Sequence, residues 1–174
     1  MANRKIGTFT VPGKPHGKER VQFNSNTKKA FTPQTQKDYE QAVWDAYYAA
    51  GHTHYEFDAL VRVDIVCCYE LPKDMSEEEQ AALIGTPAYR GSPVEKRRQA
   101  WERKNLKKNE KKYGPLPDGD NVLKSILDGL NEVSYHDDTQ VIEASVRSVY
   151  GRESCTQVRI TVLAPKDTTG GDAE

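Results

Sequence analysis

The sequence predicts a single α+β domain in which helices pack on a mixed or antiparallel sheet. Its 174 residues are an ordinary length for one domain. Apolar residues recur at strand spacing in some segments and at helix spacing in others, and the two kinds of segment are mixed along the chain. No apolar run approaches the roughly 18 residues that cross a bilayer, and the first residues lack a signal-peptide apolar region. We therefore expect a cytoplasmic protein with no membrane partner.

The N-terminal segments predict three short strands and one helix. Residues 6–11 have a strand-like pattern that ends at the Pro12-Gly13 turn. The stretch RVQFNSNTKKAFT predicts two more strands around an Asn-Ser-Asn turn, held by three apolar anchors: Val21, Phe23 and Phe31. Apolar residues then recur at helical spacing over residues 32–50, which begin with Thr-Pro.

Residues 58–71 form the clearest predicted strand, because apolar and polar residues alternate along them. The composition changes in residues 74–113. Ser76 and Glu79 have the spacing of a capping box, which predicts a short helix. The stretch VEKRRQAWERKNLKKNEKKY is helical in composition but poor in apolar residues, so we expect an exposed basic helix that becomes ordered on a partner. We interpret residues 74–113 as an extended basic helical insertion.

The C-terminal part predicts a helix at residues 120–131 and then two strands at 140–150 and 156–163. A Gly-Arg-Glu-Ser turn joins the two strands, so we expect them to pair with each other in antiparallel fashion. The domain is expected to span residues 1–163, followed by a polar, disordered tail at 164–174. The three cysteines include no CxxC pair, which argues against a disulfide framework and a zinc site and favours small core residues.

The net charge of −1 conceals three charged blocks. Residues 1–31 hold seven basic residues and one acidic residue, and residues 90–112 hold ten and three. Residues 113–146 reverse the sign, with one basic and seven acidic residues. Two basic segments flanking an acidic one suit a polyanion held beside a cation-loaded catalytic pocket. A solvated surface whose charges balance explains the same composition, so charge alone leaves both interpretations open.

Five aspartates lie between positions 118 and 138, and they surround one amphipathic helix. On a helical wheel for residues 120–131, one side carries only apolar side chains: Val122, Leu123, Ile126, Leu127 and Leu130. The opposite side carries four polar residues: Asp120, Asn121, Lys124 and Asp128. Asp120 is expected to be the N-cap and Asp118 to lie on the loop before it. Both carboxylates would then point at a helix N-terminus, which favours negative charge.

A second acidic pair, Asp137-Asp138, comes just before the strand at 140–150, where three side chains are expected to pack inward: Ile142, Ala144 and Val146. A short turn after the helix brings the chain back, so we expect Asp138 to lie near Asp118 and Asp120. Three carboxylates so close would repel one another and raise their own pKa values, and a hard divalent cation removes that conflict. Mg²⁺ bound there could polarise a phosphodiester and lower the pKa of an attacking water. Lys124 could then neutralise the phosphorane or protonate the leaving oxygen.

Other kinds of site match the sequence less well. In an EF-hand loop counted from Asp118, glycine and glutamate are required where Leu123 and Gly129 stand. No Gly-x-Ser-x-Gly motif or Cys/His arrangement indicates a nucleophilic triad. The carboxylate cluster is therefore the favoured chemistry.

The stretch PDGDNVLKSILDGLNEVSYHDDTQV resembles the signature of the RusA-type Holliday junction resolvases, which are crossover junction endodeoxyribonucleases associated with phages and prophages. That signature reads Asp-x-Asp-Asn-x-x-Lys, an apolar helix with a further Asp, a turn and Asp-Asp-x-Gln-Val. The stretch VPGKPHGKERVQF and the following KAFTPQTQKDYE resemble the family's opening strand, basic loop and first helix. The similarity extends from about Phe9 to Leu163. Gly119 departs from the family pattern, which usually has an apolar residue there.

The resemblance implies a RusA-like fold, a homodimer and paired nicking of symmetry-related strands at a four-way DNA junction in phage or prophage recombination and repair. It implies that Asp118, Asp120 and Asp138 bind Mg²⁺, with Mn²⁺ as a substitute, and that Lys124 is the catalytic lysine. Three further motif positions are expected to play supporting roles: Asn121, Asp128 and Asp137.

The basic segments are expected to grip DNA phosphates. The expected DNA-binding residues are Lys14, Lys18, Arg20, Lys96, Arg97, Arg98, Arg103, Lys104, Lys107 and Lys108. Two alternatives stay open at this point. One is a metal-dependent nuclease acting on flaps, single strands or RNA, and the other is a non-catalytic DNA-binding accessory protein.

Overall fold

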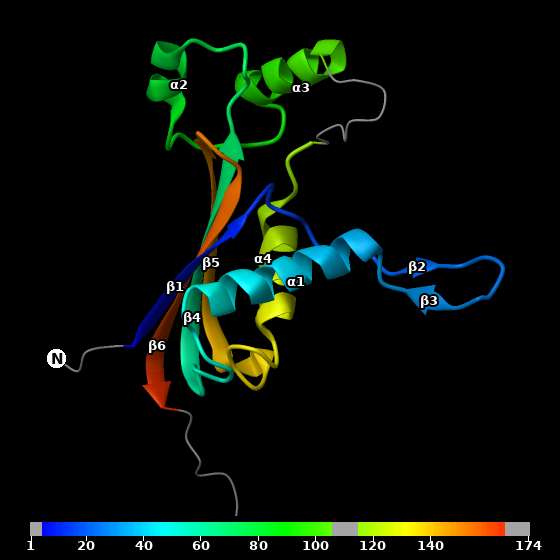
Figure 1. The fold of residues 1–174 in the computed structure, drawn as a ribbon, viewed down its shortest axis with the longest axis vertical. Coiled ribbons are helices and arrows are strands. Elements are labelled where there is room, and N and C mark those ends of the chain that lie inside the picture. The colour runs from blue at the N-terminus through cyan, green and yellow to red at the C-terminus, as the bar shows by residue number, and fades with distance from the viewer. Residues whose placement is uncertain (1–4, 106–114, 166–174) are drawn as a thin grey trace, which may run out of the picture.

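A computed structural model describes residues 5–105 and 115–165 and shows a four-stranded mixed sheet with helices packed on it (Figure 1), which confirms the predicted α+β class. The elements in chain order are β1 (Ile6–Pro12), β2 (Gln22–Phe23), β3 (Ala30–Phe31), α1 (Gln34–Ala49), β4 (Ala59–Glu70), α2 (Glu77–Leu83), α3 (Pro93–Asn105), α4 (Gly119–Leu130), the 3₁₀ helix η1 (Asp138–Gln140), β5 (Val141–Gly151) and β6 (Cys155–Pro165). No helix within the described ranges has the length and apolar character needed to cross a membrane.

The strand order is β1-β6-β4-β5, so the predicted pairing of the last two strands with each other is wrong. β6 pairs antiparallel with both β1 and β4, whereas β5 pairs parallel with β4. The parallel pair needs a long crossover, which α2, α3 and α4 supply. The turn after β5 then passes the end of β4, where the Glu70 N–H donates to Ser154 Oγ at 3.1 Å. β4 therefore lies between the two strands that the short turn connects.

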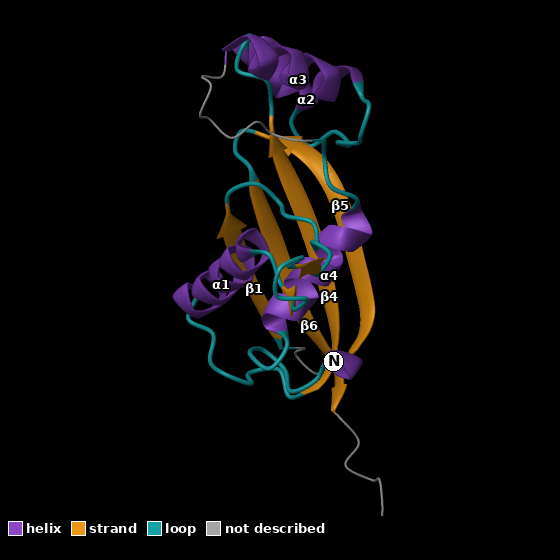
Figure 2. Cartoon of the chain, turned by 90° about the vertical axis from the view of Figure 1, so that its right-hand side faces the viewer, coloured by secondary structure: helices purple, strands orange, loops and turns teal. Residues whose placement is uncertain are grey.

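Helices α1 and α4 cover the same face of the sheet (Figure 2). The core between them takes its side chains from the periodic positions that the sequence predicts: Tyr39, Val43 and Tyr47 of α1, Val61, Val63 and Ile65 of β4, and Val122, Ile126 and Leu130 of α4. Burying each large apolar side chain is worth about 1.5–3 kcal/mol. Cys67 and Cys68 are also buried, and none of the three cysteines forms a disulfide.

Two groups of apolar side chains that were expected to pack inward are exposed. Phe23 has 75% of its surface exposed, and its neighbours Val21 and Phe31 are also exposed, because the β2–β3 hairpin projects from the body (Figure 1). On β5, Ile142 is 55% exposed and Ala144 is exposed as well. The start of α4 lies over β5 and its later turns pack on α1, so the first part of β5 stays uncovered.

The predicted basic helix exists as α3, but it is not exposed all round. Three charged side chains of α3 are buried: Glu95, Arg98 and Glu102. Helices α2 and α3 lie together beyond one end of the sheet (Figure 2), and α2 begins with the predicted Ser76–Glu79 capping box. The described part of the insertion is thus packed on the domain. Its residues 106–113 lie outside the described residues, as do residues 166–174 of the predicted tail, whose first two residues belong to β6.

Helices α1 and α4 approach each other closely at Gly129. A Cβ atom added there would lie 3.2 Å from both Cβ and Cγ1 of Val43. We expect Gly129→Leu to lower the free energy of unfolding by about 2 kcal/mol, because overpacking a core forces neighbouring side chains and backbone to shift. Urea denaturation measures this change.

The matched test is the same substitution in a Val43→Ala background. Alanine at position 43 leaves room for the new side chain. The two changes in the free energy of unfolding should therefore not add, and Gly129→Leu should be less destabilising in that background. Strict additivity of the two effects would contradict the close contact.

Candidate functional site

The site begins where α4 begins. The helix starts at Gly119 rather than Asp120, so Asp118 takes the N-cap position and Asp120 lies in the first turn. The predicted capping by the Asp120 side chain is therefore wrong. The Asp118 backbone oxygen accepts hydrogen bonds from the N–H groups of Asn121 and Val122, while its side chain makes no capping bond. The side chains of Asp118 and Asp120 are 59% and 69% exposed, so both carboxylates remain accessible at an electropositive helix end.

Lys124 lies on the same exposed face of α4 as Asp120, as the helical wheel predicts. Its Nζ atom is 3.9 Å from Asp120 Oδ2, which is a loose pairing between two exposed groups. Asp128, one turn further on, forms a short ion pair with Lys18, whose Nζ also lies 3.5 Å from Glu40 Oε1. The Asp128 charge is thus partly balanced, and Lys124 is the cation of α4 that remains close to the first-turn carboxylate.

Asp138 lies at the other end of α4. The Tyr135 hydroxyl donates to the Leu127 backbone oxygen at 3.1 Å, so the chain that carries Asp138 three residues later turns back beside the last turns of the helix. A helix of 12 residues is about 18 Å long. β5 passes the start of α4 only at Val146, whose side chain lies next to Gly119. The return of Asp138 to Asp118 and Asp120 within one chain is therefore not observed.

The carboxylates at the start of α4 are the kind of ligand that a hard divalent cation prefers, but the described part of one chain brings too few of them together. Asp118 and Asp120 offer exposed carboxylate oxygens, which are the ligands that Mg²⁺ prefers. Among the described residues, no three or more His, Cys, Asp or Glu side chains are grouped so that they could hold a metal ion. Asp137 does not add a ligand at this point, because its side chain accepts the Thr139 N–H at 2.8 Å and caps η1.

A basic pocket of about 350 Å³ adjoins Asp118. Its lining includes four basic side chains together with the start of α4: Lys14, His16, Lys18, Arg90, Asp118 and Asn121. The loop between β1 and β2 forms one wall, held by a hydrogen bond of 2.9 Å from the Lys18 N–H to the Asn121 backbone oxygen. Burial and, to a smaller extent, the Arg98 charge lower the pKa of Lys14 to about 8, against the opposing effects of Glu102 and Glu95.

The basic residues expected to bind DNA are not equally available. Arg20, Lys96, Arg103 and Lys104 are exposed. Arg98 is buried, and Arg97 is engaged by Asp74 and Glu79, with its Nη1 atom 3.0 Å from Glu79 Oε1. Lys107 and Lys108 lie outside the described residues. The exposed face of α3 therefore offers three of the expected basic groups.

Arg90 is a site residue that the sequence did not predict. Its Nη2 atom lies 3.3 Å from Asp118 Oδ1, although the two residues are far apart in the chain. The Nε–H and Nη2–H groups of the same guanidinium donate to the Leu116 backbone oxygen at 3.1 and 2.8 Å. Only the excess of basic residues between positions 90 and 112 signalled this region, and it could not single out Arg90.

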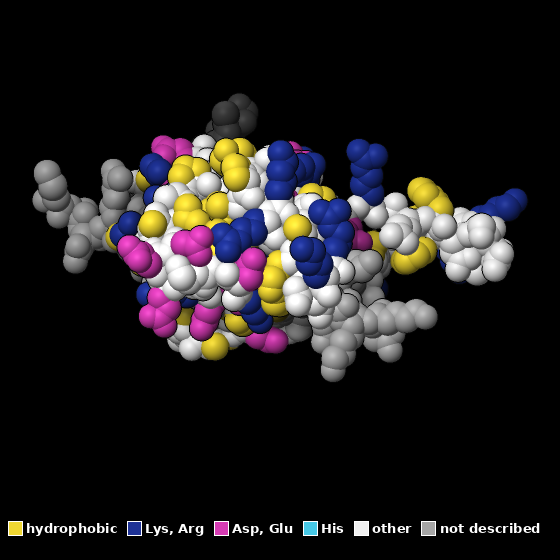
Figure 3. All heavy atoms as spheres, turned by 90° about the horizontal axis from the view of Figure 1, so that it is seen from above, with side chains coloured by type: hydrophobic (Ala, Val, Ile, Leu, Met, Phe, Trp, Pro, Cys, Tyr) yellow, Lys and Arg dark blue, Asp and Glu magenta, His cyan; other side chains and the backbone are white. Residues whose placement is uncertain are grey.

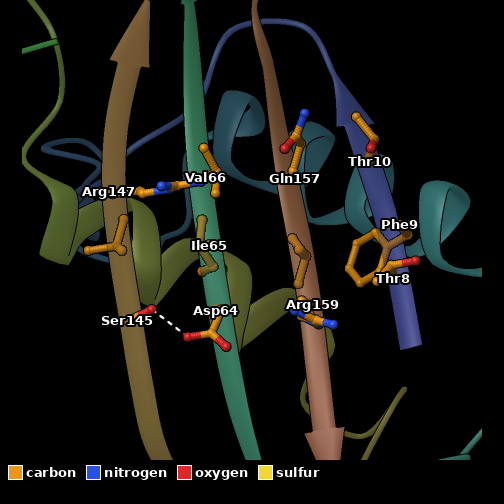
Figure 4. A pocket seen from close by; sticks show the side chains of 12 residues that line it. Thr8, Phe9, Thr10, Asp64, Ile65, Val66, Ser145, Arg147, Gln157 and Arg159 are labelled. Carbon is orange, nitrogen blue, oxygen red and sulfur yellow. Dashed lines mark hydrogen bonds between the residues drawn. The ribbon is translucent and has the colours of Figure 1, made fainter. Parts of the chain in front are cut away.

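A larger cavity of about 700 Å³ lies on the sheet face opposite α1 and α4 (Figure 4). Side chains of all four strands point into it, including Thr10, Asp64, Arg147 and Arg159. Partial burial pushes the pKa of Asp64 upward, but hydrogen bonds from Arg62 and Ser145 outweigh this and lower it. Asp64 is thus held by its own neighbours, and the cavity is separate from the start of α4.

The family model described as Endodeoxyribonuclease RusA matches residues 12–162. No curated protein matches the chain. The matched range contains β1 from its last residue, the basic loop, all four helices and nearly all of β6, and it includes every candidate ligand and Lys124. Nucleases of this family depend on a metal ion in general. The chain therefore belongs to the RusA family of endodeoxyribonucleases, whose members resolve crossover junctions.

Proposed function

We propose that the protein is a homodimer that uses Mg²⁺ to nick two symmetry-related strands of a four-way DNA junction, in the recombination or repair of phage or prophage DNA. The observation that carries the proposal is the start of α4, where two exposed carboxylates adjoin a pocket lined by basic side chains. Carboxylates for a cation and basic groups for phosphates are the two requirements of metal-assisted phosphodiester hydrolysis.

In this proposal Asp118, Asp120 and Asp138 hold the cation, which would polarise the scissile phosphodiester and lower the pKa of the attacking water. Lys124 stands beside Asp120 and remains exposed, so its ammonium group can face the negative charge that develops on the phosphorane. It can also give a proton to the leaving oxygen. Asn121 orients the site through its backbone oxygen, which accepts the Lys18 N–H.

The separation of the carboxylates along α4 supports a site built from two subunits. One chain brings Asp118 and Asp120 to one end of the helix and Asp138 to the other. A two-fold axis places the same surface of two copies face to face, with their directions reversed. We infer that each site combines Asp118 and Asp120 of one protomer with the partner subunit's Asp138. The cation would then stabilise the dimer as well as the transition state.

Phosphates of the bound DNA would lie in the basic pocket beside Asp118 and along the exposed side of α3. Lys14, His16 and Lys18 line one wall of that pocket, while Lys96, Arg103 and Lys104 face solvent on the helix. Such contacts supply affinity that falls with salt concentration and carry little sequence information. The branch geometry, rather than a base sequence, would then select the substrate.

The proposed site predicts complementation between inactive variants. Asp120→Asn and Asp138→Asn should each abolish Mg²⁺-dependent nicking while leaving junction binding intact, because each removes a cation ligand from an exposed position. Dimers that combine one subunit of each variant should recover nicking, since one of their two sites contains only unaltered ligands. An equal mixture would restore about a quarter of the sites. Strand-mapped cleavage of four-way, flap and linear duplex DNA at equal salt measures this.

Asp45→Asn is the matched control, because Asp45 is an exposed aspartate of α1 remote from the start of α4 and should leave nicking unchanged. Nicking that persists in Asp120→Asn would refute the assignment of the site. Absence of complementation would show that the ligands belong to one chain. Preferred cleavage of flaps would show that the substrate is another branched DNA rather than a four-way junction.

The lowered pKa of Lys14 predicts that DNA binding depends on pH. A lysine carries its charge below its pKa, so a group with a pKa of about 8 is charged at pH 7 and largely neutral at pH 9. Junction affinity, measured without divalent cations, should fall over this range, and the salt dependence should become shallower by about one ion. Lys14→Arg should remove the fall, because arginine keeps its charge. The same fall in Lys14→Arg would exclude Lys14 as its cause.

A further inference from the structure

The chain segment that leads into Asp118 is held by the insertion. Leu116, two residues earlier, has a buried side chain, and both of its backbone polar groups bond to side chains of the 74–105 segment. Glu95, only 1% exposed, accepts the Leu116 N–H at 2.9 Å. Arg90 donates two hydrogen bonds to the Leu116 oxygen. We call Arg90 and Glu95 the Leu116 clamp.

The clamp is itself firmly placed. Glu95 also accepts the Gly91 N–H in a short hydrogen bond and the Gln99 side-chain N–H at 3.3 Å. Ser92 Oγ accepts the Glu95 N–H at 3.0 Å and bonds to the hydroxyl of Tyr150 on β5. Glu95 is therefore tied to the sheet through the start of α3. A side chain supported in this way can hold a loop to within the fraction of an ångström that catalysis requires.

Arg90 also reaches the carboxylate itself. The Nη2 atom that donates to Leu116 lies 3.3 Å from Asp118 Oδ1, so one guanidinium spans the loop backbone and the candidate ligand. Exposed ion pairs add little to stability, typically below about 1 kcal/mol. Because Arg90 and Asp118 are both exposed, the contact is better suited to setting the direction of the carboxylate than to stabilising the fold.

We propose that Arg90 is a positioning residue for Asp118, and that the insertion thereby sets the geometry of the catalytic loop. This inference rests on the proposed function of Asp118 as a cation ligand. A planar guanidinium can donate to two acceptors in fixed directions, whereas an ammonium group cannot reproduce that fork. The effect of Arg90 should therefore appear in turnover and in cation affinity rather than in DNA affinity.

The test compares Arg90→Gln and Arg90→Lys with the wild type. For Arg90→Gln we expect kcat to fall about 10- to 100-fold with little change in KM, as small misplacements of reacting groups produce. Arg90→Lys should recover only part of that loss. In the metal-free protein, hydrogen exchange of the peptide containing Leu116 should become faster, and calorimetry should show weaker Mn²⁺ binding. Arg152→Gln, an exposed arginine in the turn after β5, is the control.

Three outcomes would overturn the inference. An unchanged kcat with a raised KM would make Arg90 a phosphate contact. Full recovery of kcat in Arg90→Lys would show that charge alone matters. Unchanged exchange and Mn²⁺ affinity in Arg90→Gln would remove the positioning role even if no DNA substrate were cleaved. Failure of the proposed function has a different signature, namely a wild-type protein that nicks no branched DNA.

A second inference comes from the hairpin of residues 20–31, which we call the arm. Every residue of the arm is exposed, and its two strands pair through Gln22–Phe31 and Phe23–Ala30. This register puts the rings of Phe23 and Phe31 on opposite faces of the ribbon. Figure 3 shows the arm projecting from the body with hydrophobic and basic side chains together on it. Exposed aromatic side chains on a projecting ribbon indicate a partner.

Charge identifies the chemistry of that partner. The arm holds Arg20, Lys28 and Lys29 and no acidic residue. Basic groups alternating with exposed aromatic rings match a nucleic acid, whose phosphates pair with the cations while its unstacked bases pack on the rings.

We propose that the arm inserts at the branch point of the DNA and stacks Phe23 against a base there. The arm continues directly from the loop that carries Lys14 and Lys18, so a base held by it would lie on the same side of the molecule as the basic pocket. The inference depends on the proposed junction substrate. It adds a base contact to a surface otherwise made for phosphates.

The test uses a four-way junction with 2-aminopurine next to the branch point, in the presence of EDTA. Binding of the wild type should change the fluorescence, and Phe23→Ala should abolish that change and raise the Kd about tenfold, the scale of one base–aromatic stack. Phe23→Tyr keeps the ring and should behave as the wild type. Tyr48→Ala, which removes an exposed ring of α1, is the control.

A fluorescence change that survives in Phe23→Ala would overturn the stacking contact while leaving the nuclease assignment untouched. Conversion of a dimer to a monomer by Phe23→Ala, seen by light scattering, would instead assign the arm to a second copy of the chain. A wild type that binds no branched DNA would overturn both this inference and the function on which it rests.

Discussion

The burial of one face of α4 is the interaction on which the rest of the site depends. Val122, Ile126 and Leu130 fill the core, and Gly129 lets the helix approach Val43 of α1 closely. These contacts fix the rotation of the helix about its axis. Because Asp120 and Lys124 lie on the opposite side, the same contacts determine where their charges stand. Apolar packing on one side of the helix therefore sets the positions of the charged side chains on the other.

The electrostatics around the start of α4 keep two carboxylates exposed without neutralising them completely. Arg90 lies near Asp118 and Lys124 near Asp120, both at more than 3 Å and all in contact with solvent. By contrast, Lys18 and Asp128 form a short pair one helix turn further on. Loose pairing leaves the carboxylates at the start of α4 able to bind a ligand, whereas the tight pair along its side also holds the loop in place.

Local patterns in the sequence were sufficient to predict α1, α4, β4 and the capping box of α2, because period and capping act over a few residues. The amphipathic wheel also placed Asp120 and Lys124 correctly on one face. Relations between distant segments were not predictable. The short turn after β5 suggested a hairpin, but β4 occupies the position between β5 and β6. Phe23 lies in a strand-like pattern, which does not show whether its side chain is buried or exposed. The residues around Arg90 give no indication of its contact with Leu116. The length of α4 was predicted, but the sequence did not show that the chain turns back beside the last turns of the helix, which leaves Asp138 away from Asp118 and Asp120.

The length of α4 has a consequence for the regulation of cleavage. The helix is about 18 Å long, so carboxylates near its two ends are too far apart for one cation to bridge within a chain. If the ligands come from two subunits, as we propose, a monomer has no complete site and cannot nick DNA. Cutting then requires a dimer, and a symmetric dimer on a four-way junction presents its two sites to equivalent strands together. In this proposal, the separation of the ligands along α4 would restrict cleavage to substrates on which paired incision is productive.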